Sequence, residues 1–194
     1  MGIRMLLKRL IRSAVTFALL GLAVVIPQTP AHAAIGEVYG PYYLMNSRGG
    51  VCLADPNAST GNNVQMILWN CGSGGQKFNN ETAVTTTDYW TFNADNGKCL
   101  APLNASKASG AAIVQTSCTT ATSGRWAYHA AGDGSTICVF IIGKLNCSNK
   151  LFTIQNLNSG MCISTQGGTP ANGTKVVQVS CGDDTAKYWR QFVV

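Results

Sequence analysis

A pair of cysteines nineteen positions apart occurs three times in the 194-residue chain, and this repetition limits the folds that the chain can adopt. The repeated segments are GVCLADPNASTGNNVQMILWNC, GKCLAPLNASKASGAAIVQTSC and GMCISTQGGTPANGTKVVQVSC, at 50–71, 97–118 and 160–181. An aromatic residue stands ten positions before the first cysteine of each copy, an asparagine six before it and a glycine two before it. These columns contain Tyr42, Tyr89 and Phe152, then Asn46, Asn93 and Asn156, then Gly50, Gly97 and Gly160. Several columns that agree without gaps indicate a triplicated structural unit.

Each column of the repeat has a plain physical interpretation. Glycine allows the turn that leads into a strand, and an asparagine side chain can close such a turn. The aromatic and aliphatic residues at strand spacing are expected to form a shared core. A unit of about forty residues with a few strands cannot bury its own apolar face, so three such units must pack together.

Short apolar runs separated by turn residues fill the chain after residue 34, and no long apolar stripe at helical spacing occurs there. Examples are VQMILW, AAIVQT, ICVFII, LFTI and KVVQV. This pattern predicts many short β-strands. About 160 residues remain once the N-terminal segment is set aside, which is an ordinary length for one domain.

All eight cysteines lie after residue 33, and they allow on the order of a hundred different pairings. The repeat selects the pairing that joins Cys52 to Cys71, Cys99 to Cys118, Cys138 to Cys147 and Cys162 to Cys181. The pair Cys138 and Cys147 lies outside the triplicate, in STICVFIIGKLNCSN, which we expect to form a hairpin that turns near Gly143 and Lys144. A metal site is the competing use of cysteine. It is disfavoured because no C-x-x-C occurs and His129 is the only histidine after residue 33, so neither a metal nor a cofactor is expected.

Residues 1–33 have the pattern of a secretory signal peptide. Four basic residues come first, an apolar run follows at 14–26, and the small-residue sequence AHA ends the segment at 31–33. The alternative is an uncleaved membrane anchor, although the apolar run is shorter than the ~20 residues that a spanning helix needs. We therefore expect a secreted, extracellular protein with a short N-terminal segment at 34–41, in a compartment where disulfides form.

The basic character of the chain belongs mostly to this N-terminal segment. The whole chain has a formal net charge of +6, but four of its fourteen Lys and Arg residues, and none of its eight Asp and Glu residues, lie in 1–33. The remainder carries ten basic and eight acidic residues, without a basic cluster. Nucleic-acid binding needs many contacts to phosphates, so this class of function is set aside.

The three copies resemble the ricin B-type lectin module. The resemblance is carried by aromatic-x-apolar-x-Asn, then Gly-x-Cys followed by Leu or Ile, then a second cysteine with an aromatic residue shortly after it, at Phe78, Trp126 or Trp189. It covers 42–194 and implies an all-β fold, a β-trefoil of three four-stranded lobes about a pseudo-threefold axis, with a disulfide in each lobe. The lobes are expected at 42–88, 89–150 and 151–194.

In the ricin B-type family each lobe can carry one shallow sugar site, and the resemblance implies which positions would form it. An aspartate two residues after the first cysteine accepts hydrogen bonds from sugar hydroxyls, a glutamine four before the second cysteine assists, and an aromatic ring two before that cysteine stacks on the sugar. The aspartate position holds Ala54, Ala101 and Ser164, the glutamine position Ile67, Val114 and Val177, and the aromatic position Trp69, Thr116 and Val179. Because the polar anchors are largely absent, the second and third lobes are expected to be structural copies.

The first lobe is the remaining candidate for a sugar site. It keeps Trp69, has Asp55 one residue past the expected place, and adds Asn70 and Gln76, and these four are the predicted carbohydrate-binding residues. One position along a strand turns a side chain to the opposite face, although Pro56 favours a loop at this point. The alternative is that Trp69 fills a partly exposed groove and Asp55 caps a turn.

The sequence offers little for catalysis, and no enzyme activity is predicted. A Ser-His-Asp arrangement would depend on His129, which we expect to be a loop residue beside the second lobe, and no G-x-S-x-G motif occurs. A glycosidase needs two carboxylates that face each other across a cleft, whereas the adjacent acidic residues at 183–184 are better explained as solvated turn residues.

The predicted function is that of a secreted, non-catalytic carbohydrate-binding protein with at most one weak sugar site, in the first lobe. Its partners would be glycans, either simple sugars or polysaccharide, with no nucleic acid and, after removal of the signal, no membrane. The alternative is a secreted β-trefoil adapted to protein binding, as an inhibitor or a surface adaptor, in which sugar binding has been lost.

Overall fold

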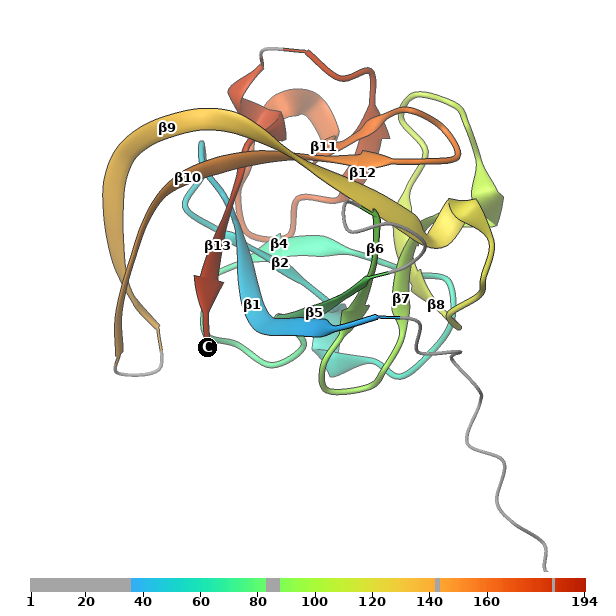
Figure 1. Ribbon diagram of the computed structural model, residues 1–194, viewed down its shortest axis with the longest axis horizontal. Helices are drawn as coiled ribbons and strands as arrows, with labels where there is room; N and C mark the ends of the chain where they lie inside the picture. The colour runs from blue at the N-terminus through green and yellow to red at the C-terminus, as the bar shows by residue number, and fades with distance from the viewer. Residues whose placement is uncertain (1–35, 83–87, 142–143, 183) are drawn as a thin grey trace, which may run out of the picture. The chain divides into compact units, whose positions relative to one another are not determined.

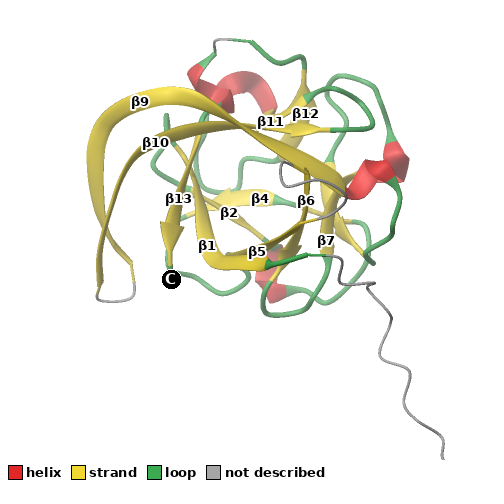
Figure 2. Cartoon of the chain, viewed as in Figure 1, coloured by secondary structure: helices red, strands yellow, loops and turns green. Residues whose placement is uncertain are grey.

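The computed structural model describes residues 36–82, 88–141, 144–182 and 184–194, so the predicted signal peptide at 1–33 lies outside the described residues. The described chain forms strands joined by turns and by single-turn 3₁₀ helices (Figures 1 and 2), and most strands are short, apart from β9 with 17 residues and β10 with 13. The strands are β1 (Val38–Asn46), β2 (Cys52–Ala54), β3 (Val64–Gln65), β4 (Ile67–Trp69), β5 (Lys77–Thr82), β6 (Asp88–Asn93), β7 (Cys99–Pro102), β8 (Ile113–Thr116), β9 (Arg125–Ile141), β10 (Lys144–Asn156), β11 (Cys162–Thr165), β12 (Val176–Val179) and β13 (Trp189–Val193). The 3₁₀ helices are η1 (Pro56–Ala58), η2 (Leu103–Ala105), η3 (Thr122–Gly124), η4 (Gln166–Gly168) and η5 (Thr185–Lys187). Within these ranges, no helix is long and apolar enough to cross a membrane.

Six strands close into an antiparallel barrel, and each repeat supplies two of them. Around the ring, β1 pairs with β5, β5 with β6, β6 with β9, β9 with β10, β10 with β13, and β13 with β1. The shorter hairpins β2–β4, β7–β8 and β11–β12 follow the barrel strands β1, β6 and β10. The same arrangement therefore recurs three times along the chain, and the predicted all-β, three-lobed β-trefoil is confirmed.

The three hairpin regions also contact one another. Strand β3 of the first lobe pairs with β8 of the second, Ala112 bridges to Val177 of the third lobe, and Ile67 bridges to Lys175. Each bridge joins a different pair of lobes. The hairpins thus form a continuous layer across the end of the barrel at which β1, β6 and β10 finish.

Asparagine and glycine of the repeat form the predicted turns where β1, β6 and β10 end. In each turn the Oδ1 of the buried asparagine accepts a hydrogen bond from the backbone N–H two residues later, at Arg48, Asp95 or Asn158. The carbonyl of the same asparagine accepts from the N–H of the glycine four residues later. These glycines have φ values of 63°, 69° and 69°, in the left-handed region that glycine adopts without strain. The turn carries each barrel strand into its hairpin.

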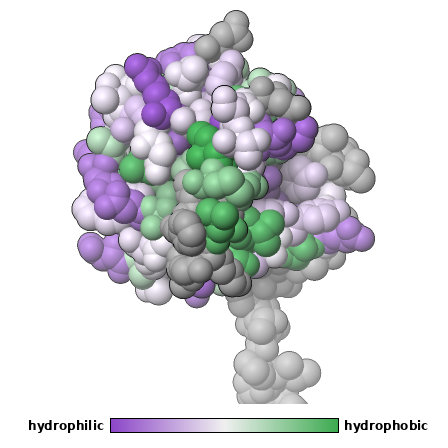
Figure 3. Space-filling view, turned by 90° about the vertical axis from the view of Figure 1, so that its left-hand side faces the viewer, coloured by the Kyte–Doolittle hydropathy of each residue, from purple (hydrophilic) through white to green (hydrophobic). Residues whose placement is uncertain are grey.

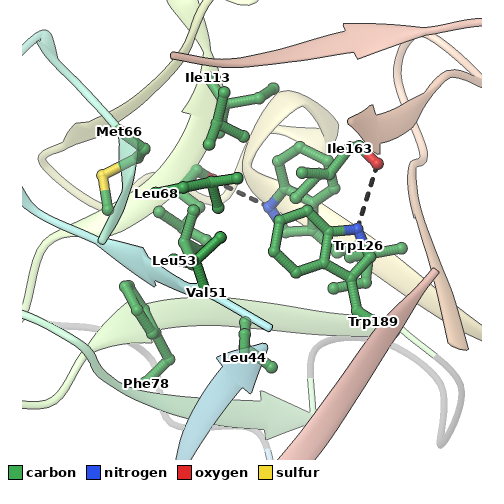
Figure 4. Packing of buried hydrophobic residues seen from close by; sticks show 13 residues of the cluster. Leu44, Val51, Leu53, Met66, Leu68, Phe78, Ile113, Trp126, Ile163 and Trp189 are labelled. Atoms are coloured by element: carbon green, nitrogen blue, oxygen red, sulfur yellow. Dashed lines mark hydrogen bonds between the residues drawn. The ribbon is translucent and has the colours of Figure 1, made fainter. Parts of the chain in front are cut away.

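One apolar core, shared by the three lobes, fills the barrel beneath the hairpins (Figure 4). Its buried members are Leu44, Val51, Leu53, Met66, Leu68, Phe78, Leu100, Ile113, Trp126, Ile154, Ile163, Val176 and Trp189. The two tryptophans are equivalent: Trp126 Nε1 donates to the carbonyl of Leu100 at 2.9 Å, and Trp189 Nε1 donates to that of Ile163 at 3.2 Å. Because residues of every lobe bury one another, no lobe can complete its core alone.

The aromatic column that precedes the first cysteines is an exception to the predicted shared core. Tyr42, Tyr89 and Phe152 stand directly across the strands from the core residues Phe78, Trp126 and Trp189, so they face the barrel interior. They are nevertheless only half-buried and lie outside the core cluster. The prediction that they belong to the core is wrong, because they lie one layer further from the hairpins, where the barrel is open.

Four disulfides join the pairs that the spacing predicts. Cys52–Cys71, Cys99–Cys118 and Cys162–Cys181 each link the two cysteines of one repeat, with Cα–Cα distances of 5.0, 4.9 and 5.0 Å. The fourth bridge, Cys138–Cys147, connects β9 to β10. Each bridge therefore joins cysteines no more than 19 positions apart and closes a local loop.

The insertion in the second repeat forms the predicted hairpin, in which β9 and β10 remain paired as far as Ile141 and Lys144. The turn predicted near Gly143 and Lys144 includes position 143, and residues 142–143 lie outside the described residues. This extension of β9 corrects one prediction: His129 lies within the strand instead of in a loop. Its Nε2 is 2.9 Å from Oε1 of Gln155 on β10.

The hairpin covers part of the outer wall of the barrel (Figure 1). The buried residues of this wall are Tyr43, Met45, Cys52 and Phe192. Ile137 of β9 packs against them, and Nη1 of the buried Arg190 donates to the carbonyl of Ser148 on β10 at 2.9 Å. Figure 3 views the side on which the hairpin lies, where hydrophobic surface gathers near the middle among more polar residues.

Candidate functional site

A hollow of about 320 Å³ opens on the first lobe, between the end of β2 and strand β4. The residues that line it are Ala54, Asp55, Pro56, Asn57, Ala58, Ile67, Trp69, Ser73 and Gly74. The pairing of Cys52 with Trp69 and of Ala54 with Ile67 places the two walls side by side. The disulfide from Cys52 to Cys71 closes the same loop and limits how far these walls can separate.

Trp69 forms the exposed wall of this hollow. Its side chain is 43% exposed, although it ends a strand whose neighbour Leu68 is fully buried. Leu68 is held to the third lobe by two backbone hydrogen bonds, to Thr174 and from Gly173. A Cβ placed on Gly173 would lie 3.9 Å from the Trp69 ring, so the backbone of the third lobe supports one edge of the indole. The backbone at Trp69 is therefore held in place, while much of its indole ring remains open to solvent.

Asp55 lies in the same hollow but presents its carboxylate differently. It follows β2 immediately and precedes η1, so it lies in the loop that Pro56 indicates. The residue is 2% exposed, Oδ1 is buried without a hydrogen-bond partner, and Oδ2 accepts only a long 3.5 Å bond from Asn96. This burial raises the pKa of the carboxyl to about 6. Its side chain makes no capping hydrogen bond to η1, so it does not serve as the alternative turn cap.

Asn70 and Gln76 do not line the hollow. The Gln76 side chain is fully buried, where Oε1 accepts from the N–H groups of Gly72 and Ser73 at 2.8 and 2.9 Å. Its Nε2 donates to the carbonyl of Asn70 at 2.9 Å. The amide of Gln76 is thus used to brace the turn that carries Ser73, and its effect on a ligand would be indirect. Asn70 is exposed beside the hollow.

The sequence interpretation missed the polar residues on the opposite wall. Asn57 and Ser73 are both exposed, and both line the hollow. Asn57 has φ of 58°, and the residues at the same place in the other repeats, Asn104 and Gly167, have φ of 52° and 74°. A residue with a left-handed backbone conformation, five positions after the first cysteine, is therefore part of the repeat. The Asn, Asn and Gly at this position of the three repeats could have predicted the loop that carries Asn57.

Equivalent hollows open on the other two lobes, but their linings differ. The second-lobe hollow, of about 230 Å³, is lined by residues such as Ala101, Val114 and Thr116. The third-lobe hollow, of about 540 Å³, includes Ser164 and Val179. In the described chain no aromatic side chain lines either of them. The lobe hollow with an aromatic wall is the one beside Trp69.

The described residues contain no group of three or more His, Cys, Asp or Glu side chains that could hold a metal ion.

Two family models match adjacent parts of the chain. The model of the ricin-type β-trefoil lectin domain matches residues 40–140, which is more than half of the chain. A second model, of the ricin-type β-trefoil lectin domain-like group, matches residues 139–193. A comparison with curated protein sequences found no match.

Solved structures share the fold at low sequence identity. The designed threefold symmetric protein ThreeFoil has a TM-score of 0.69 at 22% identity, over 80% of this chain and 100% of its own. The exo-β-1,3-galactanase 1,3Gal43A of Clostridium thermocellum has a TM-score of 0.68 at 21% identity, over 80% of this chain but only 30% of its own. The Rhizoctonia solani agglutinin has a TM-score of 0.64 at 15% identity, over 80% and 95% of the two chains.

Proposed function

The chain belongs to the ricin-type β-trefoil lectin family, and from this premise we propose that it is a secreted, non-catalytic protein that binds carbohydrate through one weak site in its first lobe. A carbohydrate-binding, lectin-like role follows from the family. The number of sites, their residues and the extracellular location are the parts that we propose. Secretion is supported by the N-terminal sequence pattern and by four disulfides, which persist in oxidising compartments.

The observation that carries the proposal is the exposed Trp69 ring on the wall of a hollow large enough for one sugar unit. A pyranose has a face of C–H groups, which stacks on the electron-rich face of an indole, and hydroxyls around its edge, which need hydrogen-bond partners. Asn57 and Ser73 offer such partners on the opposite wall. Asp55 also lines the hollow, but its unpaired Oδ1 is buried, so a sugar hydroxyl would reach this acceptor only if the loop after β2 moved on binding.

One such site would bind weakly. A single stacked ring with few hydrogen bonds leaves little surplus after the entropy of association, which corresponds to a dissociation constant of roughly 1 mM. The second and third lobes, which lack an aromatic wall, would add little to this affinity. We therefore expect useful binding only where sugars are displayed at high density, as on a polysaccharide or a glycan-coated surface.

A dense glycan array that compares the unmodified protein with Trp69→Ala tests the proposal. We expect signal on a subset of glycans and a loss of roughly two- to tenfold in the variant, because the stacking contact contributes about 0.5–1.5 kcal/mol. Thr116→Ala, at the same position in the second lobe, is the matched control and should bind as the unmodified protein does.

An array without signal, or one on which both variants lose binding equally, would contradict a first-lobe sugar site. The first of these results would favour the alternative, a β-trefoil adapted to protein contact, and a pull-down would then be the appropriate experiment.

A further inference from the structure

A further hollow, of about 300 Å³, lies at the open mouth of the barrel, away from the three hairpins. Its lining residues are Tyr39, Tyr42, Asn80, Tyr89, Tyr128, Phe152 and Gln191. They come from β1, β5, β6, β9, β10 and β13, so every strand of the barrel contributes to it. The hollow therefore lies on the barrel axis and belongs to no single lobe.

Three of these residues are the aromatic column of the repeat. Tyr42, Tyr89 and Phe152 occupy the same position in the three repeats, and equivalent residues can meet only around the axis that relates the lobes. The core does not require them, since they are half-buried and lie outside the core cluster. The repeat thus places three rings around one cavity that the sugar site does not use.

Neighbouring rings stand nearly perpendicular to one another. The Tyr39 and Tyr89 rings are 6.4 Å apart at 82°, those of Tyr89 and Tyr128 are 5.8 Å apart at 84°, and those of Tyr128 and Phe152 are 6.4 Å apart at 72°. Tyr39, Tyr89, Tyr128 and Phe152 are therefore linked by successive edge-to-face contacts. Together with Tyr42 these residues line the cavity, and we call the five of them the aromatic box.

Several polar groups of this cavity already have partners within the protein. Asn80 Oδ1 accepts from Thr91 Oγ1 at 2.8 Å and from the Tyr128 hydroxyl at 3.0 Å. At the rim, the Tyr39 hydroxyl donates to Glu37 Oε2 at 2.6 Å. A ligand rich in hydroxyls would have to compete with these contacts for Asn80, Tyr128 and Tyr39, and each hydroxyl left without a partner would cost binding free energy.

The charge around the cavity favours a cation. No Lys, Arg or His is among the described residues that line it, while Glu37 places a carboxylate at its rim. The faces of aromatic rings attract cations, and this attraction is strongest where the cation is removed from water. A primary ammonium needs an acceptor for each of its three N–H groups, and the Glu37 carboxylate at the rim already accepts from Tyr39. A quaternary ammonium has no N–H to satisfy, so it loses less when it leaves water.

We propose that the aromatic box at the barrel mouth binds a quaternary ammonium group, such as the trimethylammonium group of a choline compound. This site is separate from the sugar hollow of the first lobe, and it requires neither Trp69 nor Asp55.

Titration of the purified protein with choline, followed by NMR of the aromatic ring protons, tests this proposal. We expect saturable shifts of the Tyr42 and Phe152 ring signals. The neutral analogue 3,3-dimethyl-1-butanol has the same shape without the charge and should bind at least about tenfold more weakly. Glycerophosphocholine is titrated in a separate arm to distinguish a lipid headgroup from free choline, and saturable binding of either compound supports the proposal.

Variants identify the box as the site. Phe152→Leu keeps an apolar side chain but removes a ring face, and we expect it to weaken choline binding by roughly fivefold or more. Tyr188→Leu, an aromatic change outside the cavity, and Trp69→Ala, in the sugar hollow, should leave the affinity unchanged. Equal binding of the neutral analogue, the absence of saturable shifts, or unaltered affinity in a folded Phe152→Leu variant would overturn the proposal.

Discussion

Asp55 lowers the stability of the folded protein in a way that the residues at the equivalent positions of the other repeats do not. The chain places a carboxylate next to a strand end where the second repeat has Pro102 and the third has Thr165. Asp55 is buried with one oxygen unpaired, and an anion in such surroundings is less stable than in water. A group retained at a cost of this kind is a good candidate for a role in binding, which agrees with its place in the first-lobe hollow.

The raised pKa of Asp55 predicts a specific dependence of stability on pH. Burial raises the pKa from its ordinary value of 3.8 to about 6 in the folded protein. Between these values the folded state holds the proton more tightly than the unfolded state, so the contribution of Asp55 to the free energy of unfolding falls as pH rises from about 4 to about 6. We expect Asp55→Asn, which has no such titration, to gain roughly 1–2 kcal/mol relative to the unmodified protein between pH 4 and pH 7.

Urea unfolding of both proteins at pH 4, 5, 6 and 7 measures this difference. Contributions from all other groups cancel when the two proteins are compared at each pH. A difference that stayed constant with pH, or that favoured the unmodified protein at pH 7, would show that Asp55 is not buried as described.

At the scale of elements, the β9–β10 hairpin is the departure from threefold repetition. Near the barrel it covers Tyr43, Met45 and Phe192, which would otherwise be an exposed apolar wall. Beyond that contact it is a two-stranded ribbon that relies on the Cys138–Cys147 bridge. Isolated two-stranded ribbons are only marginally stable in water. The hairpin should therefore open more easily than the barrel from which it extends.

Replacement of both hairpin cysteines by serine tests this division. We expect faster amide hydrogen exchange at 138–141 and 144–147, with little change in β1, β5 or β13, because the bridge closes only this outer part of the ribbon. The control pair Cys99→Ser and Cys118→Ser opens a longer loop inside a lobe and should lower the stability of the whole domain, by about 3 kcal/mol. The same exchange pattern in both double variants would mean that hairpin and barrel unfold as one unit.

For the molecule as a whole, three lobes share one core while each bridge remains local. Residues from every lobe meet in that core, so loss of one lobe would expose the apolar surface of the other two. The bridges add stability by restricting the unfolded chain within each repeat. Folding is thus expected to be cooperative across the domain even though each disulfide closes only a local loop.

Complete reduction should therefore unfold the protein. Three bridges that each contribute about 3 kcal/mol amount to much of the roughly 5–15 kcal/mol by which a domain is usually stable. We expect the reduced and alkylated protein to lose its near-ultraviolet circular dichroism and its cooperative thermal transition. If a sharp transition persisted within a few degrees of that of the oxidised protein, the core alone would be sufficient for folding.

Much of the candidate site could be predicted from the repeat. The rest could not, because it depends on the direction in which individual side chains point. The Trp69 position follows from its place two residues before a repeated cysteine, and its ring does line the hollow. The roles of Asp55 and Gln76 do not follow in this way. The loop after β2 buries the carboxylate of Asp55. The turn at 70–73 takes up both the oxygen and the nitrogen of the Gln76 side-chain amide in hydrogen bonds.

The sequence by itself determined the three lobes, the pairing of the six repeated cysteines and the asparagine turns, because each of these is a local arrangement repeated at a constant spacing. Only the tertiary structure decided that Tyr42, Tyr89 and Phe152 meet around an open cavity instead of joining the core. That outcome depends on how six strands close into a barrel and how far the core fills it. Both are properties of contacts between repeats, on which the spacing within one repeat carries no information.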